Sequence, residues 1–160
     1  MKLVFVCTAN VFRSVIAEGL CRKFLEDQEL DRDLTVDSAG IGNTCGNRRP
    51  PLILREFLAE LGIDVAEHRS KRLTQKIIGT ADLIIPMTRR QERKILTTFP
   101  SAKGKIRLLR SFDPSSIHPD VKDPWEPVPQ KIEKVYDAIY PAVLGLIRSN
   151  RLANLSITHK

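Results

Sequence analysis

The sequence predicts an α/β fold, a single doubly wound domain over residues 1–160 with a four-stranded parallel sheet in the order 2-1-3-4 and helices on both faces. Short apolar runs of β type alternate along the chain with segments whose apolar residues recur at helical spacing. Such alternation implies parallel strands joined by right-handed crossovers. The length of 160 residues, with 42% hydrophobic and 28% charged residues, suits one globular domain.

The first half of the chain contains two expected strands and two expected helices. Residues 2–7, KLVFVC, form a continuous apolar run, as in a strand buried on both faces. Apolar residues recur every three or four positions over 15–25, which predicts a helix. Residues 34–38 are expected to form a second strand, and a helix over 52–61 is expected to end at Gly62.

The second half repeats the alternation and then departs from it. A third strand is expected over 81–87, and a charged amphipathic segment follows it. A fourth strand is expected over 105–110. Residues 111–129 contain five prolines and no periodicity, which predicts a long loop of the kind that often carries function. A helix over 131–148 closes the fold.

Composition argues against several classes of protein. No run reaches the roughly 18 apolar residues of a membrane-spanning helix, and the N-terminus lacks the features of a signal peptide. We therefore expect a cytoplasmic protein with no membrane partner. Cys7, Cys21 and Cys45 have no zinc-like spacing, so no metal is expected. The net charge of +7 suits acidic or phosphorylated partners. The sequence has no nucleic-acid-binding signature, so nucleic acid is not expected as a partner.

The loop after the first strand has the composition of an anion site. Cys7 and Arg13 are separated by five residues at a strand-to-helix junction. Backbone N–H groups of such a loop can point inward, and the helix that begins near Arg13 adds its positive dipole. A phosphate there would also meet the Arg13 guanidinium. A cysteine in this field is expected to be a thiolate and therefore a nucleophile.

A thiolate that cleaves a phosphate ester needs an acid for the leaving oxygen and then a base for water. The long loop offers two Asp-Pro pairs, at Asp113 and Asp123. Composition alone makes the two equal candidates, because Asp-Pro pairs also serve simply to start turns.

The segment VCTANVFRS, residues 6–14, closely resembles the phosphate-binding loop of the low-molecular-weight protein tyrosine phosphatases. The resemblance continues in the family's order over nearly the whole chain, at Ser38-Ala39-Gly40, Leu61-Gly62-Ile63-Asp64, His68-Arg69-Ser70, Ala81-Asp82-Leu83-Ile84 with Met87, and Asp123-Pro124-Trp125. It implies a cofactor- and metal-independent phosphomonoester hydrolase, most of all a protein tyrosine phosphatase, that forms a cysteinyl-phosphate. The implied substrate is a phosphotyrosine protein or a small aryl phosphate, and inorganic phosphate is the product.

The resemblance also implies roles for individual residues. Cys7 is the nucleophile, Arg13 holds the phosphate, and Asp123 is the acid, whereas Asp113 is a turn former. The remaining positions complete the phosphate loop, support its Asn10 or line the substrate cleft; they are Thr8, Ala9, Asn10, Val11, Phe12 and Ser14 in the loop, Ser38 and His68 as supports, and Trp125 and Thr44 at the cleft.

Two departures from the family pattern and one agreement with it bear on specificity and regulation. Phe12 stands where most members carry a second cysteine, so the usual disulfide within the loop is not expected. Tyrosine-specific members often present an aromatic wall after the position of Ser38, whereas this chain has residues 41–45, IGNTC, there, which leaves Trp125 as the main aromatic. Val11 is a branched apolar residue, which at this position resembles the tyrosine enzymes. A threonine at this position would resemble the phosphoarginine-directed branch.

Two alternatives remain open from the sequence. An arsenate reductase on the same scaffold would relay disulfides through two further cysteines near residues 80–90, and residues 82–90 contain none. A non-catalytic phosphate-binding module would require neither Cys7 nor Asp123.

Overall fold

A three-stranded parallel sheet forms the centre of the chain in the computed structural model, which describes residues 1–27 and 34–157, the last part (150–157) by its backbone alone. The strand β1 (Lys2–Cys7) lies between β2 (Thr35–Gly40) and β3 (Leu83–Pro86), in the order β2-β1-β3. Both neighbours pair with β1 in parallel. The predicted domain of residues 1–160 therefore includes two segments, 28–33 and 158–160, that lie outside the described residues.

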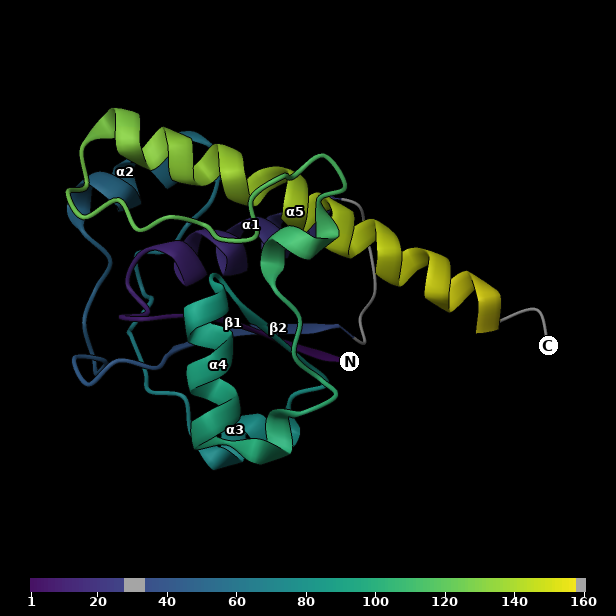
Figure 1. Cartoon of the computed structure of the whole chain (residues 1–160). Coiled ribbons are helices and arrows are strands. Elements are labelled where there is room, and N and C mark those ends of the chain that lie inside the picture. The colour runs from purple at the N-terminus through teal and green to yellow at the C-terminus, as the bar shows by residue number, and fades with distance from the viewer. Residues whose placement is uncertain (28–33, 158–160) are drawn as a thin grey trace.

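Helices cover both faces of the sheet, as the alternation predicted (Figure 1). On one side lie α1 (Arg13–Asp27), α2 (Leu52–Glu60) and α5 (Pro129–Ile157). On the other side lie the shorter helices α3 (Gln75–Thr80) and α4 (Arg89–Thr98). The two 3₁₀ turns are η1 (Pro100–Ala102) and η2 (Leu109–Phe112). Among the described residues, none of the helices combines the length and the apolar character that crossing a membrane requires.

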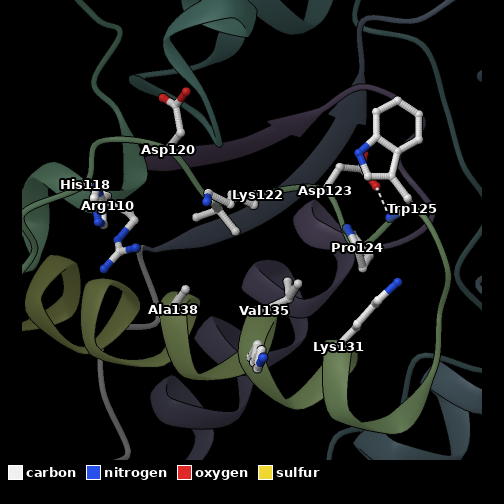
Figure 2. A pocket seen from close by; sticks show the side chains of 12 residues that line it. Arg110, His118, Asp120, Lys122, Asp123, Pro124, Trp125, Lys131, Val135 and Ala138 are labelled. Atoms are coloured by element: carbon white, nitrogen blue, oxygen red, sulfur yellow. Dashed lines mark hydrogen bonds between the residues drawn. The ribbon is translucent and has the colours of Figure 1, made fainter.

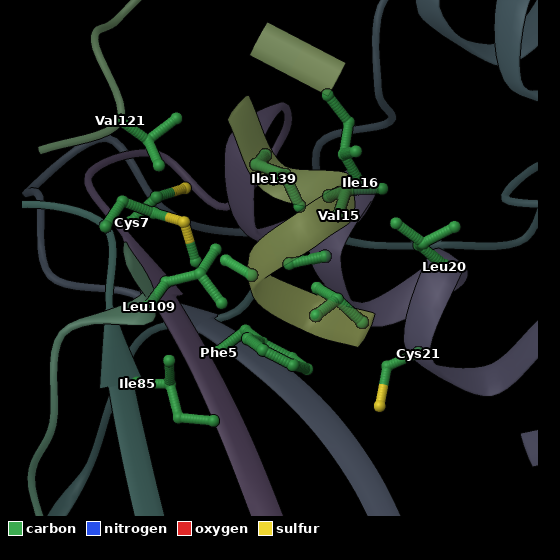
Figure 3. Close-up of a cluster of buried hydrophobic side chains, with 14 of the residues drawn as sticks. Phe5, Cys7, Val15, Ile16, Leu20, Cys21, Ile85, Leu109, Val121 and Ile139 are labelled. Atoms are coloured by element: carbon green, nitrogen blue, oxygen red, sulfur yellow. The ribbon is translucent and has the colours of Figure 1, made fainter. Parts of the chain in front are cut away.

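The strand β1 has no polar face because it supplies both cores. Leu3 and Phe5 belong to the larger core with α1 and α5, whereas Val4 and Val6 belong to the smaller core with α3 and α4. Figure 3 shows Phe5 in the larger core. All four side chains are completely buried. Burial of alternate residues on opposite faces is the reason for the unbroken apolar run at the start of the sequence.

The fourth strand, expected over 105–110, does not form as a strand in the described part of the chain. Residues 105–107 do lie beside β3, but they make only one parallel bridge, between Ile106 and Ile84. Two backbone bonds flank it, Ile84 N–H to the Lys105 carbonyl at 2.7 Å and Arg107 N–H to the Ile84 carbonyl at 3.0 Å. The chain then leaves the sheet edge, because residues 109–112 turn into η2.

Contact with α5 holds η2 away from the sheet. The carbonyl of Phe112 lies so close to Gly145 that a Cβ at that position would be 2.0 Å from the carbonyl oxygen. Only glycine allows this approach of backbone to helix. The apolar residues over 105–110 therefore pack in two places, some at the edge of the sheet and others against α5. Periodicity alone does not reveal this division.

Two helices differ from expectation. The short helix α3 was not predicted; it begins after Thr74, whose side chain accepts a hydrogen bond from the Ile77 N–H, and it buries Ile78. Six residues give too few turns for a periodic signal. The last helix, expected over 131–148, begins earlier, at Pro129, a residue suited to a first turn, and continues past the expected end to Ile157.

Candidate active site

The loop between β1 and α1 curls around the sulfur of Cys7. We call residues 7–14 the phosphate loop. The backbone N–H of Asn10 points at Cys7 Sγ from 3.3 Å, and Ser14 Oγ lies 3.0 Å from the same sulfur. Asn10 has a φ of 55°, the left-handed conformation that asparagine tolerates better than most residues. This turn reverses the chain and directs the N–H inward.

The side chain and carbonyl of Asn10 are held from several elements. Its Nδ2 donates to the hydroxyls of Ser14 and Ser38, both at 2.9 Å. Its Oδ1 accepts from the Lys71 N–H at 2.9 Å, and a ring nitrogen of His68 lies 2.9 Å from its carbonyl oxygen. Asn10 is fully buried, so these bonds satisfy groups that would otherwise be costly to bury. Ser38 and His68 thus lie where the resemblance implies supports of the loop.

Glu18 extends this network and was not singled out from the sequence. Its carboxylate accepts a hydrogen bond from the Ser38 hydroxyl and lies 3.8 Å from His68 Nδ1. Glu18 is four residues after Ser14, on the same face of α1. That spacing could have indicated its position, but the partners come from other segments.

Arg13 joins the phosphate loop to the loop that carries Asp123. The Arg13 side chain is 6% exposed. It donates to the Val121 carbonyl at 3.0 Å and to Asp123 Oδ2 at 2.8 Å. Asp123 Oδ1 accepts in turn from the Trp125 N–H at 3.1 Å (Figure 2). The guanidinium is therefore fixed at the floor, and the carboxylate, 46% exposed, lies at the rim.

Cys7, Arg13 and Asp123 line one pocket of about 180 Å³. Its other walls come from the phosphate loop and from prolines and the tryptophan around it: Ala9, Val11, Phe12, Pro51, Pro124, Trp125 and Pro127. Trp125 lies at the edge and is 91% exposed. Thr44 is exposed and is not part of this lining, because its turn folds over the outer side of the phosphate loop, where the Gly42 N–H donates to the Thr8 carbonyl.

The other Asp-Pro pair lies elsewhere. Asp113 is 7% exposed and accepts from the Ser115 N–H and hydroxyl at 3.0 and 2.6 Å. This arrangement is typical of an aspartate that closes a turn. Asp113 does not line the pocket of Cys7.

Two larger pockets adjoin this site, on either side of the loop of residues 120–125. One, of about 410 Å³, lies between that loop and α5, with Val135 and Ala138 at its base (Figure 2). The other, of about 440 Å³, lies between that loop and α4. Asp123 and Trp125 line all three pockets. Among the described residues, no group of three or more His, Cys, Asp or Glu side chains is placed to hold a metal ion.

The three free thiols are expected to react at different rates. Burial raises the pKa of Cys21 to about 12, and burial also raises the pKa of Cys45. Because only a thiolate is alkylated, Cys21 should remain unmodified by iodoacetamide at pH 8. Cys7, which lines the pocket, should react first, and inorganic phosphate should protect it. Peptide mass spectrometry over a time course measures the order; fast labelling of Cys21 in the folded protein would contradict it.

Comparisons with known proteins agree with this geometry. The sequence profile of the family "Low molecular weight phosphotyrosine protein phosphatase" matches residues 2–155. The chain is 32% identical over 151 residues to the "Probable low molecular weight protein-tyrosine-phosphatase EpsP" of Ralstonia solanacearum, covering 90% of this chain and 97% of that protein. It is 31% identical over 126 residues to the "Protein-arginine-phosphatase" of Bacillus subtilis, covering 78% and 80%.

A solved structure of the YwlE mutant from Bacillus subtilis superposes with a TM-score of 0.85 at 28% identity, covering 94% of this chain and 99% of that one. The family match spans nearly the entire chain and includes the loop that surrounds Cys7. The chain therefore belongs to the low molecular weight phosphotyrosine protein phosphatase family.

Proposed function

We propose that this phosphatase hydrolyses phosphotyrosine in proteins through a cysteinyl-phosphate formed on Cys7. The observation that carries the proposal is the meeting of a sulfur, a buried guanidinium and a carboxylate at one 180 Å³ pocket. Binding of phosphate alone requires neither the sulfur nor the carboxylate.

The first step places each residue in a defined role. Cys7 Sγ attacks phosphorus, forming the S–P bond while the bond to the leaving oxygen breaks. Arg13 exchanges its bond to Asp123 for the non-bridging oxygens, which the start of α1 also faces, and charge stabilisation there lowers the barrier. Asp123 gives its proton to the leaving oxygen.

The second step returns the enzyme to its starting state. Asp123, now a carboxylate, takes a proton from water as the water oxygen attacks phosphorus. The S–P bond breaks, inorganic phosphate leaves, and the thiolate returns. The Ser14 hydroxyl, 3.0 Å from Cys7 Sγ, stabilises the departing sulfur by donating a hydrogen bond to it.

The pocket walls favour an aryl ester. Val11, Phe12 and the surrounding prolines offer apolar surface, and Trp125 can stack on a substrate ring at the edge. The Val11 side chain has no polar atom that could bond the guanidinium of a phosphoarginine. A free nucleophilic thiol suits a reducing compartment, so we place the protein in the cytoplasm.

Initial rates on matched phosphopeptides test the proposal. We expect kcat/KM for a phosphotyrosine peptide to exceed that for the phosphoserine peptide by about tenfold or more, since the shorter residue forfeits the apolar contacts. A phosphoarginine peptide is the third arm. Faster hydrolysis of phosphoarginine would overturn the tyrosine assignment while leaving the cysteine chemistry in place.

A further inference from the structure

The pocket between α4 and the 120–125 loop is a continuation of the catalytic pocket. It measures about 440 Å³ and shares Arg13, Asp123 and Trp125 with the pocket that contains Cys7. A substrate whose phosphorylated residue occupies the catalytic pocket would therefore extend an adjacent residue into this second space. An extended chain advances about 3.3 Å per residue, so that neighbour lies one or two positions away.

The α4 side of this pocket carries two cations with no internal partner. Arg90 and Lys94 are four residues apart, so they lie on the same face of the helix and line the pocket together. Both are exposed, and neither side chain makes a hydrogen bond or an ion pair within the described part of the chain. The α4 wall of the pocket therefore carries two positive charges that no described side chain neutralises by an ion pair.

The carboxylates in the same pocket are already engaged. Asp123 pairs with Arg13 at 2.8 Å in the free protein and, as the proposed general acid, carries a proton and no charge when substrate is bound. Asp120 accepts a hydrogen bond from the Arg89 backbone N–H at 2.8 Å. Asp120 also points away from α5 (Figure 2). These contacts leave Arg90 and Lys94 as the charges available to an incoming group.

The helix that carries the two cations is held at a fixed position relative to the phosphate loop. Gln91, between them in sequence and 4% exposed, donates from Nε2 to Thr8 Oγ1 at 3.2 Å and accepts from the Met87 N–H at 2.9 Å. The Val121 N–H also donates to the Met87 carbonyl at 2.8 Å. The first turn of α4 is therefore tied both to the phosphate loop and to the loop that carries Asp123.

We infer that Arg90 and Lys94 form a subsite for a carboxylate side chain of the substrate, one or two residues from the phosphorylated residue. This inference rests on the proposed function, because it requires a phosphorylated protein segment in the catalytic pocket. The subsite selects acidic sequences around the phosphorylated residue, and its contribution falls with ionic strength because the cations are exposed.

Three phosphotyrosine peptides of equal length test the subsite, with glutamate, glutamine or lysine at the positions flanking phosphotyrosine. We expect wild-type kcat/KM for the glutamate peptide to exceed that for the glutamine peptide by about three- to tenfold, the effect of two exposed ion pairs. The lysine peptide should be slower still. The difference should appear in KM, because the contact is equal in the ground and transition states.

Charge reversal identifies the residues responsible. The ratio of glutamate to glutamine kcat/KM should fall to about one or below in Arg90→Glu/Lys94→Glu. It should be kept in Arg93→Glu, a change of the same sign on the same helix at a position outside the pocket. Using the ratio within each enzyme cancels any general loss of activity.

The outcomes separate the two proposals. Equal rates on the glutamate and glutamine peptides by wild type, or a ratio that survives the double variant, overturn the subsite and leave the proposed function intact. Failure to hydrolyse any of the three peptides overturns the proposed function, and the subsite falls with it.

Discussion

Cys7→Ser is expected to lower kcat for p-nitrophenyl phosphate and for phosphotyrosine peptides by about 10⁴-fold or more. A serine hydroxyl in the same place is a far weaker nucleophile, because it stays protonated: the hydrogen-bond partners of Sγ among the described residues, the Asn10 N–H and the Ser14 hydroxyl, are not bases. The fold should be unchanged, since the substitution is close to isosteric in a loop held by Asn10.

Phosphate binding separates loss of chemistry from loss of the site. The rise in Tm caused by inorganic phosphate should be kept in Cys7→Ser, because the main-chain donors and Arg13 remain. Cys45→Ser is the matched control: Cys45 Sγ donates to the Thr8 carbonyl at 2.9 Å, and a serine can do the same. Equal rates in wild type and Cys7→Ser would indicate a non-catalytic phosphate-binding module.

Asp123→Asn is expected to lower kcat on phosphotyrosine peptides by about 10²- to 10⁴-fold, the range typical of a lost general acid. An amide has no proton to give to the phenolate oxygen. With p-nitrophenyl phosphate, whose leaving group needs no proton, the first step should survive and the second should fail. Stopped-flow absorbance should therefore show a burst of about one equivalent of nitrophenolate, followed by slow turnover.

The other Asp-Pro pair provides the control for that experiment. Asp113→Asn should leave kcat within about twofold and affect only stability, because the side chain accepts from Ser115 outside the pocket. A large kcat loss in Asp113→Asn with normal activity in Asp123→Asn would reverse the assignment. Absence of the burst in Asp123→Asn would show that this residue does not serve the second step.

Much of the site could be read from the chain because its core is local. The spacing of Cys7 and Arg13 at a strand-to-helix junction predicted the anion site, and the resemblance implied the roles of Asn10 and Ser14. The left-handed Asn10 and Ser14 belong to the same turn as Cys7, so both meet its sulfur within a few residues. The apolar run of β1 likewise predicted a central strand, since a strand between two helix layers has no polar face.

Contacts between distant segments could not be read in this way. The link from Gln91 to Thr8 and the Val121 carbonyl beside Arg13 depend on how α4 and the 120–125 loop pack against β1. The place of Thr44 outside the pocket and the single bridge at Ile106 have the same origin. Spacing along the chain determines which groups meet within one turn. Packing determines which turns meet, because apolar surface is buried and buried polar groups find hydrogen-bond partners only when the helices have packed against the sheet.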